Sequence, residues 1–193
     1  MKESKSAVRL LYASAVFIAS AVVFCAVFAP LLAPYDPSAV SPEEILEHSS
    51  AAHWFGTDAL GRDILSRVIY GARSSVAFAF CSAFCTMALG LSLGMVSGYF
   101  GGLADKSVQC LVALFQGLPG TSLMIAIAAI LPENDFRIII ALTLTSWTGF
   151  SRIVRNEVLR IKGETYMEGI RSIGAGHWYI LRKYVFPNLL PVL

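Results

Sequence analysis

Charged side chains and glycines recur at short spacing in residues 53–75, HWFGTDALGRDILSRVIYGARSS. The segment carries five charged side chains and three glycines between two long apolar stretches. Gly56 and Gly61 allow turns, and either Asp58 or Asp63 could cap a helix that begins at residue 64. These residue types are suited to turns, helix capping and ion pairing.

The basic residues of this segment predict ion pairs with its two aspartates. The pairing cations are expected to be Arg62, Arg67 and Arg73. From residue 64 the apolar residues fall on one face of a helix and the polar residues on another. This pattern predicts an amphipathic helix that lies along the membrane interface before the next apolar stretch turns inward.

The sequence contains none of the common catalytic or nucleotide-binding motifs. It has no H-E-x-x-H, no G-x-S-x-G and no phosphate-binding G-x-x-x-x-G-K-[ST]. The four cysteines, in or at the edge of apolar stretches, are expected to pack as small residues. We therefore expect no catalysis, no cofactor and no bound metal, and any energy must come from another protein.

The composition predicts an all-α integral membrane protein, because 56% of the residues are hydrophobic and only 15% are charged. Four complete spans are expected, at about 10–33, 76–98, 108–131 and 136–154. A fifth apolar run begins at Val185 and stops at Leu193, so we expect about four and a half spans of a longer chain. The first span is expected to be a retained anchor. None contains an internal charge, which argues against a self-powered ion-coupled carrier.

Positive charge predicts the orientation of these spans. The N-terminus carries Lys2, Lys5 and Arg9, and the segment 151–184 carries seven lysines or arginines against three glutamates. Four spans separate these two regions, so both lie on one side, which the positive-inside rule makes cytoplasmic. Segments 34–63 and 132–137 then lie outside.

Small and polar residues inside the spans leave two interpretations open. A row of small residues at four-residue spacing favours close helix packing, with a ligand groove as the alternative: Ser82, Thr86, Gly90, Gly94 and Gly98. A proline kink in QGLPG, and hydroxyl and aromatic groups in the fourth span, either line a polar pathway or are ordinary packing features. The candidate lining residues are Gln116, Pro119, Thr145 and Trp147.

Between Gly163 and Gly174 the inner basic segment predicts a short helix, with Gly174 at the C′ position. Its apolar residues share one face, while Glu164, Glu168 and Arg171 lie elsewhere. A helix of this length is marginal alone, so the apolar face requires either lipid headgroups or a protein partner.

This inner segment resembles the EAA loop of permease subunits in bacterial ABC importers. The pattern E-A-A-x-x-x-G, then nine residues and I-x-L-P, is matched in spacing by Glu168, Gly174 and Pro187. Glycine and isoleucine replace the two alanines, and Tyr184 and Phe186 replace the isoleucine and leucine. The resemblance implies a coupling helix in a cleft of the cytoplasmic ATPase. Its implied contact residues are Glu164, Tyr166, Met167, Glu168, Gly169, Ile170, Arg171, Gly174 and Pro187.

The segment 53–75 resembles one branch of these importers, the second permease of dipeptide, oligopeptide and nickel uptake systems. GYFGG at 98–102, followed by Asp105, resembles the same branch. The signature residues include Gly56, Thr57, Asp58, Gly61, Arg62, Asp63, Ser66, Arg67, Tyr70, Gly71 and Arg73. Besides the structural ion pairs, contact with an external binding protein or gating at the outer mouth are alternatives for this segment.

The resemblance implies a type I importer permease with six spans in the bacterial cytoplasmic membrane. Implied partners are a homologous second permease, two ATPases, an extracytoplasmic binding protein and the lipid bilayer, with no nucleic acid. Peptides are the expected substrate and nickel is the alternative. We expect an N-terminal part, 1–75, and a permease core, 76–193, whose coupling loop is 155–184. More distant rivals are a self-standing secondary transporter or channel and a membrane anchor.

Overall fold

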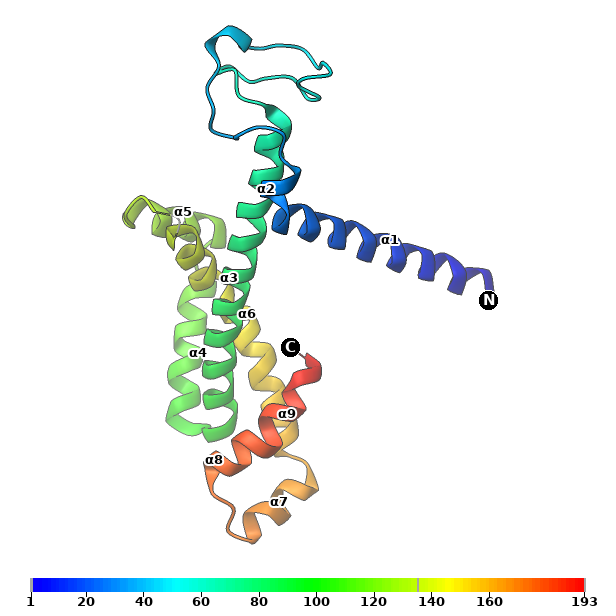
Figure 1. The fold of residues 1–193 in the computed structure, drawn as a ribbon. Helices are drawn as coiled ribbons and strands as arrows, with labels where there is room; N and C mark the ends of the chain where they lie inside the picture. The colour runs from blue at the N-terminus through cyan, green and yellow to red at the C-terminus, as the bar shows by residue number, and fades with distance from the viewer. Residues whose placement is uncertain (1, 135, 193) are drawn as a thin grey trace. The chain divides into compact units, whose positions relative to one another are not determined.

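In a computed structural model, residues 2–134 and 136–192 are described, and the regular elements in these ranges are all helical (Figure 1). The all-α class expected from the composition is therefore confirmed. The terminal Leu193, where the fifth apolar run stops, lies outside the described residues. The elements are α1 (Lys2–Val27), α2 (Ala29–Leu32), η1 (Pro42–Glu44), α3 (Ile64–Phe100), α4 (Gly102–Gln116), α5 (Gly120–Ile130), α6 (Phe136–Lys162), α7 (Thr165–Ser172), α8 (His177–Ile180), η2 (Leu181–Val185), α9 (Phe186–Leu189) and η3 (Leu190–Val192).

Two described helices are long and apolar enough to cross a membrane, at Arg9–Val27 and Ile64–Phe100. Helices α4 and α5 meet the same test together, but they are bent by 91° at the break between them. The third expected span is therefore broken, because α4 ends with Gly117 as its C-cap and Pro119, which has no amide hydrogen, is the N-cap from which α5 begins. The fourth expected span, 136–154, forms part of α6, which is not among the helices that pass. Its spanning role stays a prediction.

The interfacial helix expected before the second span does not form separately. Residues 64–75 are instead the first three turns of α3, a continuous helix of 37 residues. The sequence between Gly71 and Val76 contains no proline, and Gly71 keeps a negative φ, so nothing stops the helix there. The expectation of a break near residue 75 was wrong for this reason.

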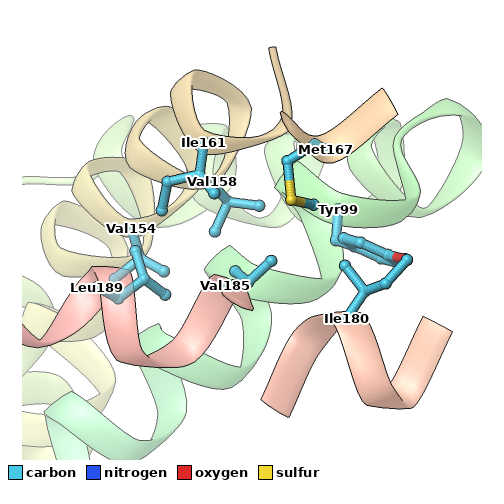
Figure 2. Close-up of a cluster of buried hydrophobic side chains, with 8 residues drawn as sticks. All are labelled: Tyr99, Val154, Val158, Ile161, Met167, Ile180, Val185 and Leu189. Atoms are coloured by element: carbon cyan, nitrogen blue, oxygen red, sulfur yellow. The ribbon is translucent and has the colours of Figure 1, made fainter. Parts of the chain in front are cut away.

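The chain forms two compact units, residues 1–79 and 80–193. In the second unit, the C-terminal part of α3, α4 and α6 pack around Trp147, which lies against Val108 and Val112. A larger core lies where α3 and α6 end and the C-terminal helices return (Figure 2). Its buried members are Tyr99, Val154, Val158, Ile161, Met167, Ile180, Val185 and Leu189.

The row of small residues on α3 faces α6. A Cβ atom added to Gly94 would lie 2.6 Å from the carbonyl oxygen of Ser151 and 2.8 Å from Cβ of Val154. Gly90 and Gly98 approach α6 as closely, one turn away on either side. The absence of side chains at these positions therefore brings the two helix backbones together.

Candidate functional site

Helix α7 begins and ends as its sequence predicts. Glu164 occupies the extended N-cap position, and Gly174, just beyond the C-cap, has φ +80°. This left-handed conformation suits glycine and terminates the helix, and the amide of Gly174 donates to the carbonyl of Arg171 at 2.9 Å. A short helix is thus held between defined ends.

The apolar face of α7 is divided between the chain's own core and the surface. Met167 is 0% exposed and packs in the core of Figure 2, with Ile170 partly buried beside it. Tyr166 and Ile173 remain 44% and 84% exposed. This burial argues against a direct contact of the Met167 side chain with the ATPase, because the chain's own core encloses it.

The charged side of α7 is exposed. Glu168, Gly169 and Arg171 are all exposed to solvent. Glu164 accepts an ion pair from Arg160 at 3.3 Å, and Arg160 also binds Glu157. Pro187 lies outside this surface, in α9. The helix therefore presents charges outward while Met167 anchors it.

Tyr99, at the end of α3, connects the core beneath α7 to two neighbouring elements. Its hydroxyl shares a 3.0 Å hydrogen bond with Nδ1 of His177, and the two rings meet edge to face. Lys162 at the end of α6 donates to the carbonyl of Tyr99 at 2.8 Å. Sequence reasoning missed this junction, because no local pattern pairs residues 78 positions apart.

A second polar junction joins α3, α4 and α6. Arg155 makes two hydrogen bonds to Asp105, at 2.6 and 2.5 Å, and Ser97 donates to the same carboxylate at 2.5 Å. Such a two-point arginine–carboxylate contact fixes orientation as well as distance. The sequence had singled out Asp105 only as the residue that follows the GYFGG motif. The two opposite charges at the ends of neighbouring spans were the signal that could have revealed the pair.

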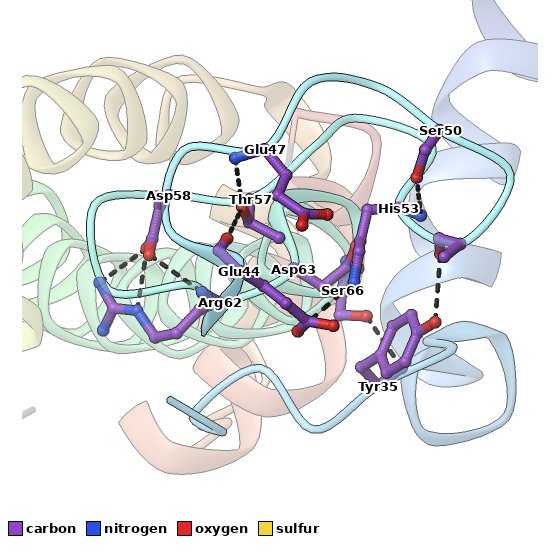
Figure 3. A network of polar contacts seen from close by, with 11 residues as sticks. Tyr35, Glu44, Glu47, Ser50, His53, Thr57, Asp58, Arg62, Asp63 and Ser66 are labelled. Atoms are coloured by element: carbon purple, nitrogen blue, oxygen red, sulfur yellow. Dashed lines mark hydrogen bonds and ion pairs between the residues drawn. The ribbon is translucent and has the colours of Figure 1, made fainter. Parts of the chain in front are cut away.

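The segment before α3 is a network built on Asp58, which binds two arginines. Figure 3 shows its contacts with Arg62. Arg62 approaches Asp58 with Nη2 at 2.8 Å, and Arg67 binds the same oxygen. Asp58 also accepts the amides of Leu60 and Arg62, and the Arg62 bond holds its pKa well below the ordinary range. Gly61 has φ +72°, and a Cβ there would overlap the carbonyl of Ser41, so the turn requires glycine.

Asp63 pairs with a histidine rather than with the expected arginine. It caps α3 by accepting the Ser66 amide at 2.7 Å, and Nδ1 of His53 lies 3.0 Å from its other oxygen. Both His53 and Asp63 are buried, beside the ring of Tyr35. No ion pair of Arg73 is found among the described residues. Ten residues of helix place Arg73 about 15 Å from the cap, beyond the reach of either aspartate.

Of the other signature residues in 53–75, some belong to this network and others lie nearer the surface. Thr57 is buried, and its hydroxyl donates to the carbonyl of Glu44 and accepts the Glu47 amide. A Cβ at Gly56 would meet the Glu47 carbonyl at 2.3 Å. Tyr70 is half-buried on α3, where it borders an open surface groove.

The His53–Asp63 pair predicts a pH-dependent stability of the segment before α3. The hydrogen bond to Asp63 raises the pKa of His53 above 6.5, against the effect of burial. Burial opposes ionisation of Asp63, but bonds from Ser66 and His53 outweigh it and lower its pKa below 3.8. The stability that this pair gives to the segment should be fully present between pH 3.8 and pH 6.5, the ordinary pKa values of aspartate and histidine. It should fall as the pH rises through the raised His53 pKa, and also as it falls through the lowered Asp63 pKa.

Hydrogen exchange of peptides covering residues 35–66 should therefore accelerate, beyond the intrinsic rate, between about pH 6 and about pH 8. The variant His53→Asn should lose this upper transition. Equal protection at both pH values in the parent protein would contradict the predicted linkage.

The candidate pathway residues are mostly engaged within the chain. Trp147 is buried between α3, α4 and α6, and the Thr145 hydroxyl donates back to the Ala141 carbonyl at 2.9 Å. These contacts support the packing interpretation for both and oppose a lining role. Gln116 is exposed and accepts a 2.9 Å bond from Arg152, while Pro119 is the exposed N-cap of α5. The exposure of Gln116 and Pro119 is compatible with lining, and the lining role stays a prediction.

Membrane-length apolar helices, together with a short charged helix that follows the basic end of α6, define a class, that of polytopic α-helical membrane proteins. Within that class, the chain belongs to the family described as "Binding-protein-dependent transport system inner membrane component", whose model matches residues 90–193. This membership confirms the resemblance inferred from the EAA pattern.

Three curated relatives are similar over most of the chain. The oligopeptide transport system permease protein OppC of Bacillus subtilis is 34% identical over 169 residues, which cover 88% of this chain and 55% of the relative. The dipeptide transport system permease protein DppC of Bacillus subtilis is 37% identical, covering 90% and 54%. The glutathione transport system permease protein GsiD of Pectobacterium atrosepticum is 36% identical, covering 86% and 56%. The chain therefore spans about half the length of the curated relatives it matches.

Proposed function

We propose that this protein is a permease subunit of an ATP-driven ABC importer for peptides. The observation that carries the proposal is α7, which exposes Glu168 and Arg171 while Met167 anchors it in the chain's own core. A helix docked on a partner can move the spans only if it is packed firmly against them. Family membership supports the same function.

In this proposal the chain hydrolyses nothing. Two cytoplasmic ATPases drive transport, and a homologous second permease completes the pore. An extracytoplasmic binding protein delivers the substrate to the face formed by 34–63. The N-terminus and α7 lie in the cytoplasm, as the distribution of lysine and arginine supports. ATP-driven closure of the ATPases moves α7, and the movement passes through the core to α3 and α6.

The peptide substrate is supported by the names of the relatives, which are permeases for oligopeptides, dipeptides and glutathione. The most direct test compares uptake of a labelled dipeptide, a longer peptide and nickel in a strain that lacks the gene and in the complemented strain. Loss of peptide uptake alone is expected. Loss of nickel uptake alone would transfer the proposal to nickel, and persistence of all three would overturn the transport function.

Reversing the charge of Glu168 is expected to uncouple the importer. Glu168→Lys places a cation where the ATPase would meet an exposed carboxylate, so ATPase co-purification and ATP-driven peptide uptake should both fall about tenfold. Gly174→Asp should act similarly, because its φ of +80° disfavours a side chain. Membrane insertion should be unchanged in both.

Glu133→Lys provides a matched control, since Glu133 is also exposed but lies in the loop between α5 and α6. It should retain ATPase association. If Glu168→Lys transports normally with the ATPases attached, α7 is not the docking helix.

A further inference from the structure

The segment that follows α7 has one buried face and one exposed face. Ile180, Val185 and Leu189 are at most 1% exposed and pack in the core of Figure 2. The opposite face carries, in chain order, aromatic, basic and apolar side chains, all exposed: Trp178, Tyr179, Arg182, Lys183, Phe186, Pro187 and Leu190. Helix α9 packs against α6, so this face turns away from the bundle.

An open groove of about 520 Å³ lies on this exposed face. It is lined by Trp178, Tyr179, Arg182, Lys183 and Pro187. Trp178 is 75% exposed, so most of its aromatic surface is open to a ligand. The groove thus combines two cations with aromatic surface.

The lysine of this groove is directed back toward α8. Its Nζ donates to the hydroxyl of Tyr179 at 2.7 Å and lies 5.0 Å from the centre of the Tyr179 ring. The side chain therefore extends back along the helix, away from the apolar residues that follow it. Lysines at a membrane boundary adopt this direction to keep their charge at the level of the headgroups.

We propose that this groove binds an anionic phospholipid of the cytoplasmic leaflet, with its phosphate at Arg182 and Lys183 and an acyl chain along Phe186 and Leu190. The inference rests on the cytoplasmic orientation proposed above. Charge complementarity selects an anionic lipid, because residues 174–193 include two fixed cations and no carboxylate side chain. Phe186 and Leu190 continue the exposed apolar surface from the groove along α9 and into η3. This continuation favours a lipid over a soluble acidic partner.

Native mass spectrometry of the assembled full-length transporter tests the proposal, with phosphatidylglycerol and phosphatidylcholine offered together. The parent complex should retain phosphatidylglycerol preferentially. Arg182→Gln and Lys183→Gln should each reduce this preference about fivefold, and the double variant should reduce it further. Lys106→Gln, which removes an exposed positive charge from α4, should leave it unchanged.

The charge-preserving variant Arg182→Lys distinguishes loss of binding from loss of folding, because it should keep most of the preference. Wild-type preference in the double variant would overturn the proposal. So would loss of ATPase association in the double variant with unchanged lipid preference, since the groove would then belong to the ATPase interface.

Discussion

Leucine in place of Gly94 is expected to force α3 and α6 apart and to lower the free energy of unfolding by about 1–3 kcal/mol. Even a Cβ at this position would lie 2.6 Å from a backbone oxygen of Ser151, and a backbone atom cannot rotate away as a side chain can. The two helices meet along the whole row of glycines, so their separation should also disturb the Asp105–Arg155 junction below. The measurement is the yield of monodisperse permease after detergent extraction, together with its thermal unfolding midpoint.

Gly71→Leu is the matched control for this prediction. Gly71 lies on the same helix, but apart from its chain neighbours and the adjacent helix backbone, no atom of the described residues lies within 4 Å of a Cβ built there. Its substitution should leave extraction and unfolding close to those of the parent. Equal behaviour of the two leucine variants would mean that the contact between α3 and α6 is not the basis of stability.

Truncating Met167 to alanine is expected to uncouple ATP hydrolysis from transport. The side chain is fully buried, so its loss leaves a cavity beneath α7 and costs about 2–5 kcal/mol. In the proposed importer, a loosened α7 would still meet the ATPase through Glu168 and Arg171, but it would transmit less of the movement to α3 and α6. The number of ATP molecules hydrolysed per peptide transported, measured in proteoliposomes, should rise.

Met167→Leu nearly conserves the volume and should cost less than about 1.5 kcal/mol, with coupling retained. An unchanged ratio in Met167→Ala would show that the core does not transmit the movement. A loss of ATPase binding in Met167→Ala would instead mean that Met167 supports docking of the ATPase rather than transmission of the movement.

Local signals were sufficient to predict α7, but not which residues of its apolar face are buried and which are exposed. Glycines on either side and a run of helix-forming residues define its ends, and both are readable in one sequence. Whether Met167 or Ile173 would be enclosed depends on Tyr99, Val185 and other residues that return from distant parts of the chain. Periodicity identifies an apolar face without identifying what covers it.

In the segment before α3, too, the sequence predicted the types of polar residue in each role better than their partners. The turn glycines and a capping aspartate were predictable from residue type. The partner of Asp63 was not, because three arginines lie nearby in sequence while the burial of the cap under Tyr35 and His53 is a tertiary effect. Likewise, a proline predicts a break after α4, but the 91° bend also reflects how α5 packs on α6.

Cross-linking from a single cysteine on α7 tests the central claim most directly. In a full-length permease whose native cysteines have been replaced, Glu168→Cys should form a cross-link with an ATPase subunit in transport-competent vesicles, and ATP should change its yield. Met167→Cys should not, because that side chain faces the permease core. A transport-competent complex in which Glu168→Cys fails to reach the ATPase would contradict the account.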